Sequence, residues 1–410
     1  MWENAININE IREIRAKTTV YLGVGAITKI NDIVKELAQN GISKILVVSG
    51  KSSYKITGAW EHTEKAFKEN NINYEIYDKV TPNPTVDQVD EAVKVGEKLG
   101  AQAVLAIGGG SPIDAGKSAA ILLKYSDKTA RDLYEYKFTP TKAVPVITIN
   151  LTHGTGTEVD RFAVVSIPEK EYKPAIAYDC IYPLYSIDDP ALMTKLPNEQ
   201  TLYVSIDALN HVVEAATTKV ASPYSILLAK ETIRLISKYL PAAIKDPNDL
   251  TARYYLLYAS LIAGISFDNG LLHFTHALEH PLSGVKPELS HGLGLSMLLP
   301  AIIKQIYPVT GQILADILSP VVPGLKGTPD EADKAAFGVE DWLFSVGVTS
   351  KLKDQGFTEG DIEKLTNLAL ETPSLGLLLS LAPTQSDKDV ISKIYRESLN
   401  SYKSLLSANV

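Results

Sequence analysis

An apolar run that leads directly into three consecutive glycines constrains the fold of this chain more than any other feature. The stretch AVLAIGGGSPIDAGKSAA occupies residues 103–120. Its first residues are typical of a short buried strand. Ser111, Pro112 and Asp114 then follow in the order of a helix start, with Ser111 as the expected N-cap. A strand, a glycine turn and a helix in this order predict one unit of a parallel α/β fold.

Two sequence patterns that bind phosphates do not fit this stretch. The triphosphate loop needs a glycine five positions before Gly116, where Ser111 stands. The dinucleotide fingerprint that starts at Gly108 needs a third glycine where Ile113 stands. The physical features that bind an anion are nevertheless present, because backbone N–H groups at a helix start attract negative charge and glycines let it approach closely. A tight turn without any ligand is the alternative.

The pattern of the chain changes near residue 186. Before this point, apolar strands predicted at 44–48, 72–77, 104–107 and 144–149 alternate with helices predicted at 57–70 and 85–99. This alternation predicts a mostly parallel sheet with helices on both faces. Beyond it, long helical segments follow, at 199–218, 224–240, 250–265 and onwards. We therefore expect an α/β domain over residues 1–185 and an all-helical domain over residues 186–410, with the active site in the cleft between them.

Composition excludes several classes of protein. The net charge of −8 does not suggest a nucleic-acid or anionic-membrane partner. Cys180 is the only cysteine, which excludes an intrachain disulfide and a cysteine-based zinc site. The first residues lack the apolar core of a signal peptide, and the longest apolar runs, such as 293–303, are too short to span a bilayer. We expect a cytoplasmic protein.

Five of the seven histidines lie between residues 211 and 291. Asp207 and His211 are four residues apart, as are His276 and His280, so each pair shares one face of a helix. His291 stands near another predicted helix start. A carboxylate with several imidazoles and no cysteine suits a divalent metal such as Fe²⁺ or Zn²⁺. The spacing leaves the ligand set open, because two further side chains lie on the same faces, those of Glu214 and His273.

Four motifs in this order resemble the iron-containing (group III) alcohol dehydrogenase family. They are GGGSPIDAGK at 108–117, HGTGTEV at 153–159, DALNHVVE at 207–214, and HALEHPL with SHGLG between 276 and 294. The resemblance covers nearly the whole chain. It implies a Rossmann-like dinucleotide-binding domain followed by an all-α metal-binding domain. It also implies an alcohol dehydrogenase or aldehyde reductase that transfers a hydride reversibly between a primary alcohol and a nicotinamide cofactor.

The same resemblance implies a role for individual residues. The metal ligands would be Asp207, His211, His276 and His291, holding Fe²⁺ or, in purified protein, Zn²⁺ or another divalent ion, with His280 beside the metal as a catalytic proton relay. The residues expected to bind the cofactor are Gly50, Ser52, Ser53, Gly108, Gly109, Gly110, Ser111, Asp114, Thr148 and Thr152. The residues expected to line the substrate pocket, unless they pack in the core, are Phe162, Val164, Phe267 and Leu272.

The chain departs from the family pattern at several positions. In NLTHGTGTEV, at 150–159, Asn150, Leu151 and His153 stand where the family usually has Pro, Thr and Ala. The segment between His280 and His291 is one residue longer than in many relatives. His273 stands where relatives usually have a small residue. We expect it to pack in the interior rather than line the pocket.

Residue 50 predicts which nicotinamide cofactor is preferred. Relatives that prefer NAD tend to carry Asp at the end of this strand, where a carboxylate bonds the ribose 2′-OH and repels a 2′-phosphate. Gly50 removes this repulsion, Ser52 and Ser53 can donate hydrogen bonds, and Lys51 adds positive charge. We therefore expect NADP(H) as the cofactor, with NAD(H) less favoured.

Other functions of the same architecture stay open. Glycerol dehydrogenases lack a metal-binding histidine at the position of His211, and 3-dehydroquinate synthases begin their ligand set with Glu rather than Asp207. A non-catalytic dinucleotide-binding sensor and a metal-dependent hydrolase are alternatives from other classes. We expect a small alcohol or aldehyde as the substrate, no nucleic-acid or membrane partner, and a homodimer or larger homo-oligomer.

Overall fold

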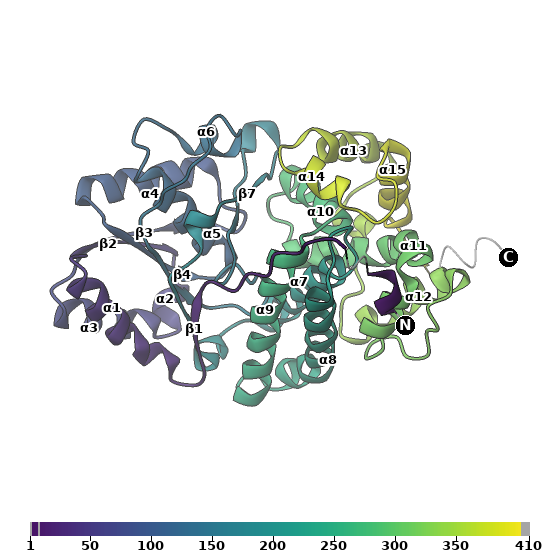
Figure 1. Ribbon diagram of the computed structural model, residues 1–410, viewed down its shortest axis with the longest axis horizontal. Helices are drawn as coiled ribbons and strands as arrows, with labels where there is room; N and C mark the ends of the chain where they lie inside the picture. Colours follow the sequence, from purple (N-terminus) through teal and green to yellow (C-terminus); the bar gives the residue numbers. More distant parts are fainter. Residues whose placement is uncertain (1, 7–8, 403–410) are drawn as a thin grey trace.

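A sheet of six strands organises the amino-terminal part of the chain. The computed structural model describes residues 2–6 and 9–402, and Figure 1 shows the sheet beside a helical part. The strand order is β1-β8-β5-β4-β2-β3, and every neighbouring pair is parallel. The strands are β1 Thr19–Leu22, β2 Lys44–Gly50, β3 Asn73–Val80, β4 Ala103–Gly108, β5 Val146–Asn150 and β8 Tyr185–Asp188. The expected α/β fold with a parallel sheet is confirmed.

Helices cover both faces of this sheet, as is usual for a parallel sheet. Successive side chains of a strand point to opposite faces. Along β2, Leu46 and Val48 therefore pack with α4 and α5, whereas Ile45 and Val47 pack with α1 and α3. Because both sets are buried, the central strands β2 and β4 contain continuous apolar runs, whereas the edge strand β3 is partly exposed and polar. The helices are α1 Lys29–Gln39, α2 Ser53–Ile56, α3 Ala59–Glu69, α4 Val86–Leu99, α5 Gly110–Leu122 and α6 Ala130–Tyr134.

The rest of the chain is helical and shares one hydrophobic core. Its helices are α7 Asn198–Ala215, α8 Pro223–Lys245, α9 Leu250–Gly270, α10 Phe274–Val285, α11 His291–Ile317, α12 Ala332–Ser345, α13 Ile362–Glu371, α14 Leu375–Ser380 and α15 Lys388–Glu397. By length and composition α11 is apolar enough to cross a bilayer, but 78% of its most apolar stretch is buried inside the protein. This helix is the centre of the core.

Short elements complete the fold. The antiparallel hairpin of β6 Phe162–Val164 and β7 Ala175–Ala177 lies between β5 and β8 in sequence. The 3₁₀ helices are η1 Trp2–Ala5, η2 Ala26–Thr28, η3 Pro168–Lys170, η4 Asp179–Ile181, η5 Pro190–Met193, η6 Pro329–Glu331, η7 Leu352–Gln355 and η8 Glu359–Asp361.

The predicted long elements are present. The unpredicted elements are helix α1, which has 11 residues, and several shorter helices and strands. The expected strands and helices between 44 and 149 and the three long helices after 198 all occur, with small shifts at their ends. β1, β8 and the β6–β7 hairpin were not predicted. β8 crosses the expected division between residues 185 and 186, so the sheet continues to Asp188.

The helix start in the glycine loop differs from the prediction. Ser111 is not the N-cap, because α5 begins at Gly110 and its N-cap is Gly109 in an extended conformation. The glycines leave the chain free to enter the helix two residues earlier than a serine cap would. Asp114 also makes no capping box. Its carboxylate accepts hydrogen bonds from Thr157 Oγ1 at 2.6 Å and Val164 N at 2.9 Å.

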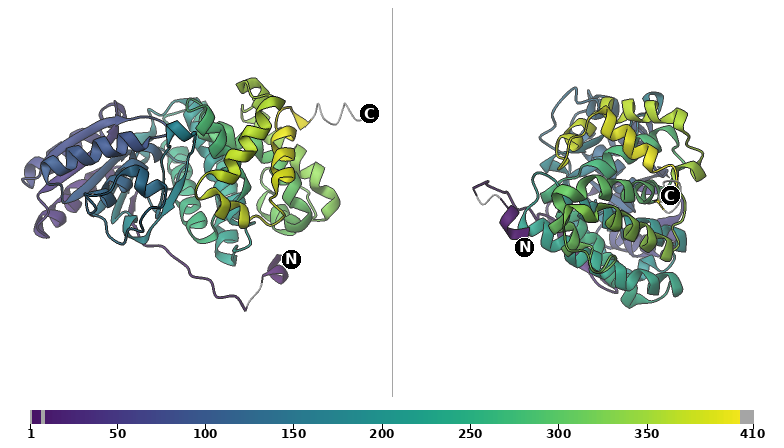
Figure 2. Two further views of the ribbon diagram at one scale, coloured as in Figure 1. Left: turned by 90° about the horizontal axis from the view of Figure 1, so that it is seen from above. Right: turned by 90° about the vertical axis from the view of Figure 1, so that its right-hand side faces the viewer.

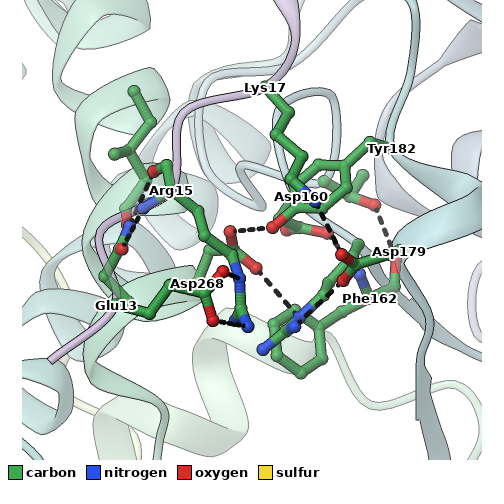
Figure 3. Close-up of polar contacts among 12 residues, drawn as sticks. Glu13, Arg15, Lys17, Asp160, Phe162, Asp179, Tyr182 and Asp268 are labelled. Carbon is green, nitrogen blue, oxygen red and sulfur yellow. Dashed lines mark hydrogen bonds and ion pairs between the residues drawn. The ribbon is translucent and has the colours of Figure 1, made fainter. Parts of the chain in front are cut away.

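A polar network joins the two parts (Figure 3). Asp268 on α9 is buried and accepts a hydrogen bond from the Tyr182 hydroxyl. Its other oxygen lies 3.5 Å from Arg161 Nε, and Arg161 Nη1 also pairs with Asp179 at 3.1 Å. Tyr182, Arg161 and Asp179 belong to the sheet-containing part. Of these four residues, Asp268 alone comes from the helical part, and it supplies that part's charge to the network.

The amino-terminal segment crosses the same junction (Figure 2). It runs from the helical part, where Trp2 Nε1 donates to Asp316 at 3.1 Å, to the start of β1. Arg15 exchanges two hydrogen bonds with the side chain of Asn269 on α9, at 2.6 and 2.9 Å. Lys17 then pairs with Asp179 at 2.6 Å. The segment thereby ties both parts together from outside.

Tyr182→Phe should destabilise the protein by about 1–3 kcal/mol, because the variant leaves one oxygen of the buried Asp268 without a donor. The measurement is the free energy of unfolding from denaturant titration. Tyr185→Phe is the matched control: its hydroxyl binds the exposed Glu36 carboxylate, so a loss of about 0.5 kcal/mol or less is expected. Equal losses in the two variants would contradict the importance assigned to this junction.

Candidate metal and cofactor site

One cavity of about 1090 Å³ lies between the two parts of the protein. Its walls come from the ends of β2 and β4, the β6–β7 hairpin, and helices α7, α9, α10 and α11. All five residues of the expected metal site and proton relay line it, as do all four residues of the expected substrate pocket. Of the expected cofactor residues, Gly50, Ser52, Ser53, Gly109, Gly110, Ser111, Asp114 and Thr152 line it. Gly108 and Thr148 do not line it, because both are buried within the sheet.

Three histidine rings converge on one carboxylate oxygen in this cavity. Asp207 Oδ1 lies 3.5 Å from His211 Nε2, 3.5 Å from His276 Nε2 and 3.8 Å from His291 Nε2. Ligand atoms of Asp207, His276 and His291 also lie within 4.8 Å of one another, which is close enough for one ion. His211 lies beside this set because its Nε2 is also close to Asp207 Oδ1. Its ring stacks on the His276 ring, with the two ring centres 4.5 Å apart.

These distances fit a divalent metal better than they fit a hydrogen-bonded cluster. Two ligand atoms that each lie about 2.1 Å from a tetrahedral ion are about 3.4 Å apart. Asp207 Oδ1 and His276 Nε2 are buried and have no hydrogen-bond partner among the described residues. One oxygen and up to three imidazole nitrogens suit Fe²⁺ or Zn²⁺. The residues present therefore fit such an ion.

Two buried glutamates orient the histidines from behind. Glu214 binds His276 Nδ1, and it also accepts the backbone N–H groups of His273 at 3.0 Å and Thr275 at 2.7 Å. Glu279 binds His291 Nδ1 in the same way. With Nδ1 occupied, Nε2 of each ring is directed at Asp207. Such carboxylate–histidine contacts fix the ring and the tautomer of metal ligands.

The pKa values of these buried groups follow from burial and from the neighbouring charges. Burial disfavours the charged form of His276, but the Glu214 and Asp207 carboxylates together outweigh it, and the pKa of His276 rises to about 9. Burial would raise the pKa of Glu214, yet His276, His273 and the Thr275 N–H group together lower it to about 2. Burial lowers the pKa of His211 to about 4 and that of His280 well below its ordinary value. The last two rings are therefore neutral at pH 7, the form that binds metals and accepts protons.

The remaining histidines differ in their surroundings. His280 lines the cavity with its ring centre 5.8 Å from that of His291, and its Nδ1 has no partner among the described residues. His273 is fully buried and pairs with Thr217 Oγ1 at 2.9 Å, so it packs in the interior as expected. His153 is also buried, between Ser205 at 3.3 Å and Arg253 at 3.0 Å. It supports the loop behind Thr152 rather than lining the cavity.

The glycine loop lies directly against the loop at 150–159. A Cβ on Gly109 would be 2.7 Å from the Thr152 side chain, and a Cβ on Gly110 would be 2.7 Å from that of Thr155. No side chain fits at either glycine without moving the opposite loop. The two loops and the start of α5 thus leave their backbone facing the cavity, which favours an anion at the helix start.

Lys117 explains why the Gly-Lys-Ser sequence is not a triphosphate loop. Its ammonium group is buried and binds Thr157 Oγ1, the Phe162 carbonyl and both the carbonyl and carboxylate of Asp160, at 2.8–2.9 Å. All of its hydrogen-bonding capacity is used inside the protein. The lysine holds the 157–162 segment in place and does not reach a ligand.

The wall of the cavity contains the expected aromatic residues and others that the sequence did not reveal. Phe162 and Phe267 meet with ring centres 5.5 Å apart, one from each part of the protein. Leu271 lines the cavity beside Leu272. Lys173 lies 3.4 Å from Glu279 and 3.3 Å from His291 Nδ1. Nothing in the local sequence signals the roles of Glu279, Leu271 and Lys173.

Family comparisons match nearly the whole chain. Residues 17–190 match the family described as "Iron-containing alcohol dehydrogenase". Residues 201–399 match the family described as "Fe-containing alcohol dehydrogenase family, C-terminal".

Individual proteins are similar over comparable lengths. The chain is 63% identical to the long-chain primary alcohol dehydrogenase AdhA of Thermoanaerobacter ethanolicus, over 97% of this chain and 100% of that protein. It is 31% identical to the NAD-dependent methanol dehydrogenase of Bacillus methanolicus, over 85% and 91%. The solved NADH-dependent butanol dehydrogenase A of Thermotoga maritima superposes with a TM-score of 0.87 at 27% identity, covering 95% of this chain and 99% of that one.

Glu214→Gln should weaken the binding of a divalent metal by about 10- to 100-fold, because the amide no longer fixes the His276 ring as a carboxylate does. Competition with a chelator, followed by metal analysis of the protein, measures this directly. Glu199→Gln, an exposed position at the start of the same helix, is the matched control and should bind metal as the wild-type protein does. Unchanged affinity in Glu214→Gln would show that this carboxylate does not orient a ligand.

Proposed function

The chain belongs to the iron-containing alcohol dehydrogenase family, and we propose that it oxidises primary alcohols and reduces aldehydes with NADP(H) as the preferred cofactor. The observation that carries the proposal is the convergence of His211, His276 and His291 on Asp207 Oδ1 in the same cavity as the glycine loop. A cofactor site alone would suit a sensor, and a metal site alone would suit a hydrolase. Their joint presence supports hydride transfer.

In this proposal Asp207, His211, His276 and His291 hold the metal, which in the cell is Fe²⁺. A divalent ion there supplies Lewis acidity that lowers the pKa of the alcohol hydroxyl. The protein's own contribution is orientation: Glu214 and Glu279 fix two of the rings. The hydrophobic wall formed by Phe162 and Phe267 excludes water from the same space.

His280 is proposed as the group that takes the proton. It lines the cavity, its Nδ1 is free of partners among the described residues, and its low pKa keeps the ring neutral before the proton arrives. A neutral imidazole near the reacting hydroxyl is suited to general base catalysis. Lys173, near Glu279 and His291, would oppose a lasting positive charge on His280 and so favour onward release of the proton.

The preference for NADP(H) is proposed from the end of β2. Gly50, Ser52 and Ser53 line the cavity at the end of β2. None of these three residues carries a negative charge that would repel a 2′-phosphate. The nicotinamide dinucleotide supplies the hydride acceptor. Gly109, Gly110, Ser111 and Thr152 would surround its pyrophosphate, and Asp114 would lie near the ribose. Relatives described as NAD-dependent or NADH-dependent share only about 30% identity with this chain.

The substrate is proposed to be an unbranched primary alcohol. Phe162, Val164, Phe267 and Leu272 form an apolar wall in the cavity, and the 63% identical relative is described as acting on long-chain primary alcohols. A polyol such as glycerol would place additional hydroxyl groups against this wall without partners. We also propose that the protein is cytoplasmic and assembles as a homodimer or larger homo-oligomer.

Reconstitution tests the reaction. Metal-free protein loaded anaerobically with Fe²⁺ should reduce NADP⁺ in the presence of short and long primary alcohols, followed at 340 nm. His276→Ala should lose both metal and turnover. His280→Ala should keep its metal while turnover falls about 100-fold or more. Absence of turnover with Fe²⁺ and Zn²⁺ would leave only cofactor binding and overturn the assignment, and loss of metal from His280→Ala would make His280 a ligand.

The cofactor preference has its own test. Gly50→Asp should shift the ratio of kcat/KM for NADP⁺ to that for NAD⁺ by about tenfold or more towards NAD⁺, because a carboxylate close to a phosphate is unfavourable. Gly50→Ala is the control, since a Cβ at residue 50 would already lie 3.3 Å from the Val80 carbonyl. The alanine variant separates this crowding from the effect of charge. Equal ratios in the two variants would place the 2′ position elsewhere.

A further inference from the structure

Leu271 has a backbone conformation that is rare for any residue with a side chain. Its φ is 59° and its ψ is −175°. This region is populated essentially only by glycine, because a Cβ crowds the neighbouring backbone there. Strained residues of this kind persist where the surrounding structure imposes them, and they gather at binding and catalytic sites.

The conformation is imposed by fixed contacts on both sides of Leu271. Before it, α9 ends at Gly270, which packs so tightly on α7 that a Cβ there would lie 2.4 Å from the Ala215 carbonyl. After it, the start of α10 is held by the Glu214 carboxylate through His273 and Thr275. The two helices meet at a bend of 106°. The short connection has to turn the chain between two ends that these contacts hold.

A glycine at residue 271 would make this turn without a steric penalty. A leucine there implies that its side chain has a use that offsets the strain. Burial in a core is not that use, because Leu271 belongs to none of the three hydrophobic clusters of the described residues. Leu271 is half-buried and lines the cavity that Phe267, His276 and His280 also line, and it lies five residues before His276.

We propose that Leu271 is a specificity-determining residue for the alcohol. Its side chain fills cavity volume beside the metal-binding histidines and leaves room for an unbranched apolar chain only. A substituent on the carbon next to the reacting one meets this side chain, and a second hydroxyl group there loses its hydrogen bonds against it. The inference rests on the proposed function and adds to it the class of alcohol that the site rejects.

Leu271→Gly tests specificity. The readout is kcat/KM for 1-pentanol relative to that for 2-methyl-1-butanol and for 1,2-pentanediol. The wild-type protein should prefer 1-pentanol, and the variant should lose this preference by about tenfold or more, the usual discrimination for one carbon-sized group. Asn71→Gly is the control: Asn71 also has a positive φ, of 54°, but does not line the cavity. It should keep the wild-type ratio.

The strain has a separate test that needs no turnover. Leu271→Ala and Leu271→Gly both remove the side chain beyond Cβ, so the difference in Tm between them reports on the backbone. We expect Leu271→Gly to melt about 1 °C or more above Leu271→Ala. At the neighbouring Leu272, which is not among the residues with positive φ, the order should be reversed, because glycine normally destabilises a folded chain relative to alanine.

The possible results separate the proposals. A wild-type protein without alcohol oxidation refutes the proposed function. An active wild-type protein whose ratio changes less than twofold in Leu271→Gly refutes the role of Leu271 alone. A lower Tm for Leu271→Gly than for Leu271→Ala shows that the conformation is not strained and removes the reason for assigning the side chain a use.

Discussion

The arrangement of the site depends on one buried carboxylate, that of Glu214. It extends from α7 to the start of α10, where it accepts the N–H groups of His273 and Thr275 and binds His276 Nδ1. A carboxylate is favoured at a helix start, since the first N–H groups of a helix have no partner within the helix. Because Asp207 and His211 lie on α7 while His276 and His280 lie on α10, this single group fixes the two halves of the histidine cluster relative to each other. The backbone of the preceding turn, with Leu271 at its centre, is a consequence of the same contact.

Features that depend on neighbouring residues could be predicted from the sequence, and features that depend on distant ones could not. The long strands and helices, the parallel sheet and the pairs of residues four apart follow from local periodicity. The short strands β1 and β8 pair across more than 160 residues, and three or four residues carry too little pattern to predict a strand. The N-cap of α5 was misplaced because a serine is the usual cap, whereas glycines permit an earlier start. The roles of Glu279 and Lys173 depend on tertiary contacts with His291 that no spacing encodes. The metal ligands and the cofactor preference stay predictions.

The cavity divides its chemistry between the two parts of the protein. The sheet-containing part presents backbone and hydroxyl groups at the glycine loop, because Lys117, the nearest cation in that motif, is used up by Thr157, Asp160 and Phe162. The helical part presents imidazoles and the Asp207 carboxylate, and Glu288 also lines the cavity. Backbone and hydroxyl groups of the glycine loop on one side and metal-binding side chains on the other allow a charged cofactor and an apolar alcohol to share one space. The contact between Phe162 and Phe267 closes that space at the junction.

The amino-terminal segment also has a consequence for how the chain is made. It is synthesised first, yet its partners Asn269 and Asp316 emerge from the ribosome some 250 residues or more later. In the same way, strand β1 can pair with β8 only after β8 has been synthesised. During translation the edge of the sheet that β1 occupies therefore stays incomplete until β8 has been made. The contact of Trp2 with Asp316 cannot form before most of the helical part exists. This tie between the two parts is thus available only late in synthesis.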